Sequence, residues 1–207
     1  MAYTTIDDPF NFFNTVLYTG ANKSITGVNF QPDWVWIKER DSGYHAIFDS
    51  VRGATKILSS NVNNAQSTQS DSLTAFGTDG FTLGADSANY VGGSSTSTVS
   101  WSWLAGGSAS SNSDGSITAS VSANTTAGFS IVKYTGNATN STVGHGLGVT
   151  PQVLIVKNLD STSSSAEHWR VQHHEVVASK VLYLNKTDAA DTNGDFQSTY
   201  PGSSTFS

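Results

Sequence analysis

The stretch TVLYTGAN at residues 15–22 is written a second time, as IVKYTGN, at residues 131–137. The segment VLYTG (16–20) lies over VKYTG (132–136), which follows 116 positions later. In both copies alternating apolar residues run into a glycine, a pattern typical of a strand that ends in a turn. Because the residues after each copy also match, this stretch determines how the chain is organised.

The match between the two halves continues strand by strand. GVNFQPDWVWIK (27–38) lies over GLGVTPQVLIVK (146–157), GATKILSSN (53–61) over VASKVLYLN (177–185), and TDGFT (78–82) over SSTFS (203–207). A period above 100 residues is too long for solenoid units of about 20–50 residues. The repeat therefore predicts two tandem domains, each with its own core.

The composition favours strands over helices. Of the 207 residues, 37% are hydrophobic and 13% charged, while 32 are Ser and 24 are Thr. Small hydroxyl residues suit strands and turns better than helices. Aromatic residues make up 11% of the chain, which is too many for a disordered polymer. There is no cysteine, which excludes disulfides and thiolate zinc sites.

The apolar patterns predict individual strands. Val99, Trp101 and Trp103 alternate with serines, so one face of that strand should be buried. The runs 34–37 and 153–156 are continuously apolar and follow Pro32 and Pro151, which favours strands covered on both faces. Six to eight short strands in about 90 residues predict tandem antiparallel β-sandwiches of jelly-roll or concanavalin-like type.

These patterns divide the chain into four parts. We expect an N-terminal docking arm at 1–12, a first sandwich at 13–105, a linker rich in Gly, Ser and Thr at 106–127 with at most one edge strand, and a second sandwich at 128–207. The second unit lacks a counterpart of residues 83–104, including VSWSW (99–103). Either the sequence is part of a longer chain, which we favour, or another chain supplies the strand.

Several classes of function are disfavoured by charge and hydropathy. The net charge is −6, the isoelectric point is near 5.1, and no stretch gathers Lys and Arg, so we expect no nucleic-acid partner. The N-terminus lacks the pattern of a signal peptide, and no run approaches about 18 apolar residues. We therefore expect a soluble protein without a membrane partner.

The reactive side chains do not form a recognised catalytic pattern. EHWRVQHHE (167–175) is dense in histidines, but His168, His173 and His174 would point to different faces of a strand. Glu39, Asp41 and Asp49 could supply carboxylates for hydrolysis, although the second unit keeps no such pair. GHGLGV (144–149) lacks the lysine of a phosphate-binding loop. We expect no enzyme activity, catalytic residue, metal or cofactor.

Exposed aromatic rings are the remaining candidates for ligand contact. Trp34, Trp36, Trp101 and Trp103 sit in strand patterns, where core packing is the default. Tyr44, Tyr90 and Tyr200 fall in predicted loops, where a ring could stack on a sugar of a host surface glycan.

Longer strings resemble a repeat family of uncharacterised proteins found widely in marine and cyanobacterial tailed bacteriophages. They are MAYTTIDDPFNFFNTVLYTG (1–20), SITGVNFQPDWVWIKERD (24–41), DSVRGATKILSSN (49–61), DGFTLG (79–84), ANTTAGFSIVKYTGN (123–137), VGHGLGVTPQVLIVKN (143–158) and YLNKTDA (183–189). The resemblance spans essentially the whole chain and implies a virion structural protein, tail-fibre-like or with concanavalin-like sandwiches. Members commonly carry a complete second unit and a third, and bring no accepted catalytic motif.

The resulting expectation is a virion structural protein assembled in the host cytoplasm, either a tail fibre or appendage for host attachment, or a capsid decoration or head fibre. A host-glycan-binding module, or less simply a depolymerising one, is the alternative. Other virion proteins and sister chains are the expected partners, and a trimer would suit a fibre. The arm offers Tyr3, Asp7, Asp8, Pro9, Phe10 and Phe12 as docking residues, an extended segment that gains its burial from a partner.

Overall fold

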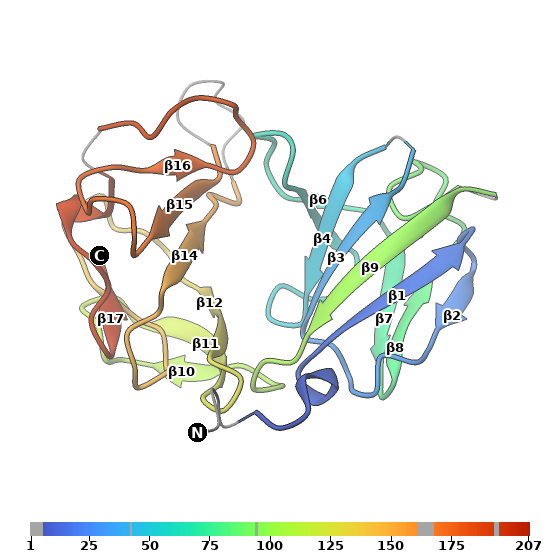
Figure 1. The fold of residues 1–207 in the computed structure, drawn as a ribbon, viewed down its shortest axis with the longest axis horizontal. Helices are drawn as coiled ribbons and strands as arrows, with labels where there is room; N and C mark the ends of the chain where they lie inside the picture. Colours follow the sequence, from blue (N-terminus) through green and yellow to red (C-terminus); the bar gives the residue numbers. More distant parts are fainter. Residues whose placement is uncertain (1–5, 42, 94, 161–167, 193–194) are drawn as a thin grey trace.

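The chain folds into two β-rich lobes, drawn on opposite sides of Figure 1. The structure is a computed structural model that describes residues 6–41, 43–93, 95–160, 168–192 and 195–207. Apart from two short 3₁₀ helices, η1 (Pro9–Asn11) and η2 (Asp195–Ser198), every regular element in these ranges is a β-strand. The expected all-β class with antiparallel sheets is confirmed.

The first lobe holds nine strands and the second lobe eight. Those of the first lobe are β1 (Phe13–Thr19), β2 (Lys23–Ile25), β3 (Trp34–Glu39), β4 (His45–Asp49), β5 (Lys56–Ser59), β6 (Ser67–Thr68), β7 (Leu73–Gly77), β8 (Gly80–Leu83) and β9 (Ser97–Trp103). Those of the second are β10 (Ser110–Asn112), β11 (Ala119–Asn124), β12 (Phe129–Lys133), β13 (Val143–Gly144), β14 (Val153–Val156), β15 (Arg170–His173), β16 (Leu182–Tyr183) and β17 (Thr205–Phe206).

Two sheets enclose the core of the first lobe. Six strands pair in the order β1-β9-β3-β4-β5-β6, and three pair in the order β2-β8-β7. Their facing apolar side chains form one buried cluster made of Ile25, Val35, Ile37, Ala46, Phe48, Ile57, Leu73, Phe81, Leu83 and Val91. β9 alternates between its two faces, but the expectation that Val99, Trp101 and Trp103 form the buried face is wrong. Thr98, Ser100 and Ser102 are buried, and the residues between them only partly so. The serines are small enough to let the two sheets approach each other.

Smaller sheets make up the second lobe. β10-β11-β12 and β14-β15-β16 are three-stranded, and β13 pairs with β17. The buried cluster contains only Ala119, Val121, Val143 and Phe206, with Val132 and Leu154 packed beside it. This core is built from fewer and smaller side chains than that of the first lobe.

The two lobes repeat one pairing scheme in the same register. In the first lobe β3 pairs with β4 so that Val35 lies opposite Phe48, and in the second β14 pairs with β15 so that Leu154 lies opposite Gln172. Ile47 lies opposite Leu58 in the first lobe, and Val171 lies opposite Leu182 in the second. In the same way Ile25 lies opposite Phe81 in the first lobe, and Val143 lies opposite Phe206 in the second. The internal repeat of the sequence is thus also a repeat of strand pairing.

One position in the scheme is filled only in the first lobe. There β9 lies between β1 and β3 and pairs with both. The corresponding strands β12 and β14 each end a sheet, and they share no pairing with a common strand among the described residues. Two exposed residues of β14, Val153 (47%) and Ile155 (40%), show the effect. The expectation that this strand is covered on both faces is therefore wrong, because the strand that would flank it is absent from the described chain.

The segment 106–127 also differs from the expected linker. It contains β10 and β11, and β11 pairs along its whole length with β12. Ala119 and Val121 are buried in the core of the second lobe. Two of the three apolar residues of β11 are alanines, which carry a weaker hydrophobic signal than Val or Ile, and this is why composition alone suggested a linker.

Candidate functional site

Two of the three tyrosines predicted to contact glycans lie against each other in the first lobe. Tyr44 immediately precedes β4 and Tyr90 lies in the connection from β8 to β9. Their ring centroids are 4.9 Å apart, with the ring planes tilted by 42°. Because Tyr44 is 40% exposed, the pair presents aromatic surface to solvent. We call Tyr44 and Tyr90 the tyrosine pair.

Buried polar groups hold the segment that carries Tyr90. The Asp86 carboxylate accepts hydrogen bonds from the backbone N–H of Tyr90 (3.0 Å) and Val91 (2.7 Å) and from Ser72 Oγ (2.8 Å). The Tyr18 hydroxyl donates to the Val91 carbonyl at 2.6 Å. Burial raises the pKa of Tyr18, and the neighbouring carboxylates raise it further, so the phenol stays neutral and keeps donating. The tyrosine pair therefore rests on a preorganised loop.

The three carboxylates considered for hydrolysis do not come together. Glu39 and Asp49 are both buried, but Asp49 lies opposite Trp34, at the other end of β3 from Glu39. Five residues of strand separate them by about 17 Å, well beyond the spacing of a glycosidase pair. Asp49 forms an ion pair with the Arg52 guanidinium, and Glu39 Oε1 accepts from the Gly93 N–H at 3.4 Å. Asp41 is exposed.

The histidine-rich segment is spread over different environments. His168 Nδ1 lies 2.9 Å from Asn185 Nδ2, and partial burial together with the charge of Lys186 lowers the pKa of His168. The rings of His173 and His174 stack with centroids 4.8 Å apart. Glu167 lies outside the described residues. Across the described ranges no three His, Asp or Glu side chains are placed to hold a metal ion.

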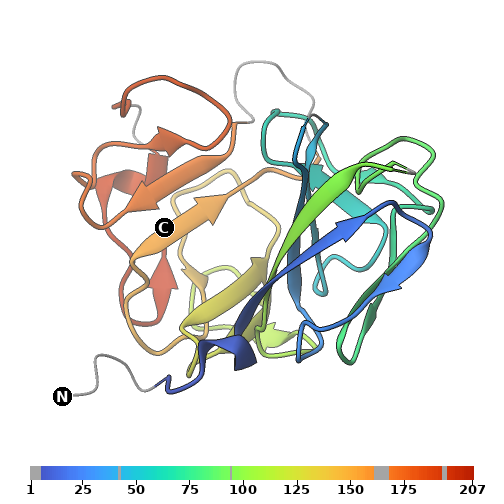
Figure 2. The same cartoon turned by 45° about the vertical axis from the view of Figure 1, so that its right-hand side comes forward.

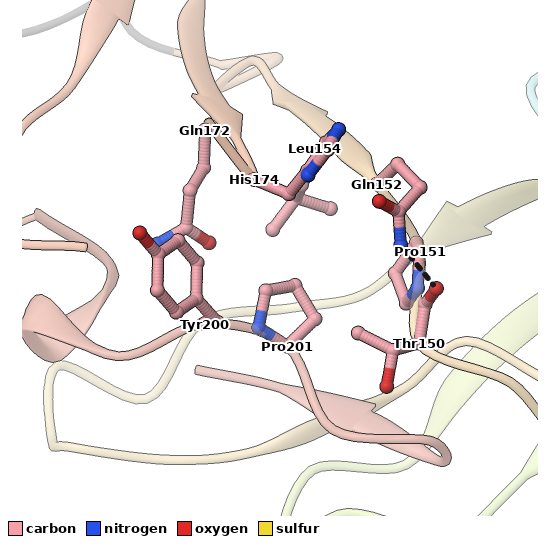
Figure 3. Close-up of a pocket in the computed structure, with 8 residues that line it drawn as sticks. All are labelled: Thr150, Pro151, Gln152, Leu154, Gln172, His174, Tyr200 and Pro201. Carbon is pink, nitrogen blue, oxygen red and sulfur yellow. Dashed lines mark hydrogen bonds between the residues drawn. The ribbon is translucent and has the colours of Figure 1, made fainter. Parts of the chain in front are cut away.

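The third predicted tyrosine, Tyr200, lines a pocket of the second lobe shown in Figure 3. The pocket has a volume of about 270 Å³ and is lined by Thr150, Pro151, Gln152, Leu154, Gln172, His174, Tyr200 and Pro201. Gln172 is almost fully buried, and its Nε2 donates to the Thr199 carbonyl at 2.6 Å. Its Oε1 has no hydrogen-bond partner within the described part of the chain. An unpaired buried acceptor is costly, so this oxygen marks a place suited to a donor.

The same place in the first lobe is filled by the chain itself. Gln152 and His174 correspond to Asp33 and Ser50, since His174 N donates to Gln152 O (2.9 Å) as Ser50 N donates to Asp33 O (2.8 Å). Asp33 Oδ2 accepts from the backbone N–H of Ala105 (2.9 Å) and Gly107 (3.1 Å), which follow β9. The pocket therefore lies where the chain leaving β9 would pass.

The predicted docking arm is described only from residue 6, so Tyr3 lies outside the described residues. Asp8 caps η1 by accepting from the Phe10 N–H at 3.1 Å, and Pro9 occupies the first helical position. Asp7 is exposed, and the Phe10 side chain is 58% exposed. The Phe12 carbonyl accepts from the Leu104 N–H at 2.8 Å, which joins the arm to the end of β9. Phe10 is thus presented on an ordered turn.

A contact between the lobes is the feature that the sequence did not reveal. Phe129 of β12 packs edge-on against Trp34 and stacks on Trp103, with centroids 6.1 Å away in each case. Trp169 is buried with Ile47 and Leu58, and its Nε1 donates to the carbonyls of Ser59 (3.0 Å) and Val62 (3.2 Å). Period-2 alternation showed that the tryptophans of β3 and β9 share a face, but not that the second lobe covers it.

Comparisons with known proteins give one match. A family model described as a domain of unknown function, DUF7483, matches residues 8–207. No curated protein and no solved structure matches the chain. Neither of the two helices in the described ranges has the length or apolar character needed to cross a membrane.

Proposed function

We propose that this chain, which belongs to the family of the domain of unknown function DUF7483, is a structural protein of a bacteriophage virion. Its role is that of a tail fibre or tail appendage that takes part in host attachment. Both lobes are built on one jelly-roll or concanavalin-like unit. The arm, with Asp8, Pro9 and Phe10, joins it to other virion proteins or to sister chains in a homo-oligomer.

The observation that carries the proposal is the tandem repetition of one antiparallel pairing scheme within one chain. Appendage proteins gain length and surface by repeating β-units, which need no active site. An aromatic contact and a hydrogen bond couple the lobes, rather than a long flexible linker. A lobe docked on the particle would therefore hold the other lobe in a defined position. The strings that resemble tailed-phage proteins support the same role.

The location of the chain on purified particles tests this function. We expect mass spectrometry of gradient-purified virions to detect the chain in stoichiometric amounts, and a cryo-microscopy map to show two-lobed density on the tail. Density on the capsid shell would instead favour a decoration or head-fibre role. Absence of the chain from purified particles would contradict both roles.

A second candidate function, glycan binding, is favoured by the tyrosine pair. Adjacent aromatic rings that are partly exposed and held by buried hydrogen bonds suit stacking on sugar rings. We expect binding on an array of host surface glycans to be lost in Tyr44→Ala. Phe10→Ala, a change at an exposed ring outside the tyrosine pair, is the control and should leave such binding unchanged. Release of reducing ends from the polysaccharide would reveal a depolymerase instead of a binding module.

A further inference from the structure

The second lobe contains two strand edges that correspond to the two edges paired by β9 in the first lobe. The first of these edges belongs to β12, which ends the sheet β10-β11-β12, and the second to β14, which ends the sheet β14-β15-β16. In Figure 2, β12 and β14 run in the same sense, as two strands must when both pair antiparallel to a strand between them. Their counterparts β1 and β3 are related in that way through β9.

The backbone of β12 directs its free hydrogen-bonding groups toward this position. In the first lobe Gly20 N–H donates to Thr96 O, and Leu104 N–H donates to Phe12 O. Because hydrogen-bonded positions alternate along an antiparallel pair, Val16 is among the residues that bond to β9. In the second lobe Asn124 and Phe129 form the opposed pair next to the turn between β11 and β12. Phe129 and every second residue after it therefore bond to β11. The counterpart of Val16, Val132, therefore points its N–H and C=O away from β11, toward the side where β9 lies in the first lobe.

The backbone of β14 points into the same position from the other side. His174 N–H donates to Gln152 O, which places Leu154 and Val156 among the residues bonded to β15. Val153 and Ile155 alternate with them and direct their N–H and C=O away from β15. Trp34 and Trp36 of β3 do the same and bond to β9.

Side-chain burial shows that the same position is underfilled. Val35 and Ile37, which face the core of the first lobe, are completely buried. Their counterparts Leu154 and Val156 are only partly buried. The unpaired Gln172 Oε1 lies in the adjoining pocket, where the first lobe holds the backbone that follows β9. Backbone direction, burial and the free acceptor thus point to one place, at the edges of β12 and β14.

We propose that β12 and β14 form an acceptor slot for one β-strand of the type of β9, supplied from outside the described residues. The donated strand runs antiparallel to both and has the pattern of β9, with small hydroxyl residues facing the core and large apolar residues facing outward. The residues that follow it cross the pocket, where a backbone N–H donates to Gln172 Oε1. This is recognition by strand addition, in which main-chain hydrogen bonds give affinity and alternate side chains give specificity.

The described residues hold no unpaired strand of this kind. The alternation VSWSW occurs once among the 207 residues, at 99–103, and that strand is paired on both sides in the first lobe. The probe is therefore a synthetic peptide of residues 95–107, added to the full chain. The matched control is the same peptide N-methylated at Ser100 and Trp101, which removes one donor toward each edge.

Hydrogen exchange with and without peptide tests the slot. We expect the peptide to slow exchange at Val132, Val153 and Ile155 and to leave the first lobe unchanged, and the N-methylated peptide to bind at least about tenfold more weakly. No binding at about 1 mM, equal binding of both peptides, or protection elsewhere would overturn the proposal. Protection of the same amides on raising protein concentration without peptide, with a dimer in mass photometry, would show that a surface of a second copy, and not a strand of the type of β9, covers these edges, and would also overturn the proposal.

Discussion

At the residue scale, Asp33 organises the junction of the two lobes. Its buried carboxylate accepts from Ser50 Oγ (2.8 Å) and from the backbone N–H groups of Ala105 and Gly107. The corresponding residue of the second lobe is Gln152, whose Nε2 donates to the Thr150 carbonyl at 3.4 Å. The pocket of the second lobe thus lacks both the carboxylate and the backbone N–H groups that meet at Asp33 in the first lobe.

Replacing Asp33 should cost stability because buried donors lose their acceptor. We expect Asp33→Ala to lower the free energy of unfolding by roughly 2–4 kcal/mol, since two backbone N–H groups and a hydroxyl lose their partner. Asp33→Asn keeps one acceptor oxygen and should cost less. Urea unfolding monitored by tryptophan fluorescence measures both, with the exposed Asp41→Ala as control. Equal stability of Asp33→Ala and the wild type would contradict this role.

Asp79 gives the first lobe a dependence on acid. Its carboxylate accepts from the N–H groups of Gly27 (3.0 Å) and Asn29 (2.7 Å), and these hydrogen bonds lower the pKa of Asp79 below its ordinary value of 3.8. A lowered folded-state pKa means that the stabilisation is present above the unfolded value and is lost as the pH falls through the folded value. The affected window therefore lies below about pH 4.

We expect Asp79→Asn to remove part of this acid dependence. The urea midpoint of this variant should fall less than that of the wild type between about pH 6 and pH 3, because a carboxamide takes up no proton in this range. Asp41→Asn, a change at an exposed carboxylate, is the control. An unchanged pH dependence in Asp79→Asn would show that the loop at Gly27 does not depend on the ionised carboxylate.

At the element scale, β3 and β14 show that the same apolar pattern can end in different environments. Both are continuous apolar runs after a proline, and both pair in the same register with the next strand. Pattern predicted their existence, position and type correctly. It could not predict their burial, because burial depends on whether a strand arrives on the second edge. β3 receives β9, whereas β14 receives none from the described residues.

This difference predicts that a lysine will have unequal effects on stability at corresponding positions of the two strands. Ile155→Lys, on the exposed side of an edge strand, should change the free energy of unfolding by less than about 0.5 kcal/mol and reduce aggregation. Trp36→Lys, at the corresponding position of β3, should be strongly destabilising, because it removes the contact with Trp101 and buries an ammonium group. Thermal unfolding and light scattering compare the two. A larger loss in Ile155→Lys would show that β14 is not an open edge.

At the scale of the whole molecule, the lobes are held together by aromatic side chains and a few hydrogen bonds. Trp169 and Leu159 of the second lobe pack with Ile47 and Leu58, and Gln66 N–H donates to the Leu159 carbonyl at 2.8 Å. Phe129 contributes a second contact between the lobes, with Trp103. Folding of the lobes and their mutual position should therefore be separable.

We expect Trp169→Ala to loosen the lobes without unfolding either. Loss of the buried indole and of its two hydrogen bonds should separate the thermal transitions of the lobes and increase the radius of gyration in small-angle scattering. Trp169→Phe should show a smaller change, and Phe10→Ala, at an exposed ring, none. A single cooperative transition with unchanged scattering in Trp169→Ala would contradict this account of the interface.

The candidate sites were predictable only in part, for the same physical reason. Loop position indicated that Tyr44, Tyr90 and Tyr200 were available for contact, and all three lie in connections between strands. That Tyr44 stacks on Tyr90 while Tyr200 lines a separate pocket depends on which loops meet in space. No sequence pattern indicated Gln172, because its unusual property is a buried oxygen without a hydrogen-bond partner, which arises only when the chain has folded.

By itself, the sequence determined that the chain is all-β and that one strand scheme occurs in both of its halves. These properties are local or follow from comparing the chain with itself, since side-chain alternation and turn residues act within a few positions. Only the tertiary structure decided that 106–127 belongs to the second lobe, that tryptophans of the first lobe cover the junction, and that β12 and β14 each have an edge without a paired strand among the described residues. Such properties depend on contacts between segments far apart in the chain, which no local pattern encodes.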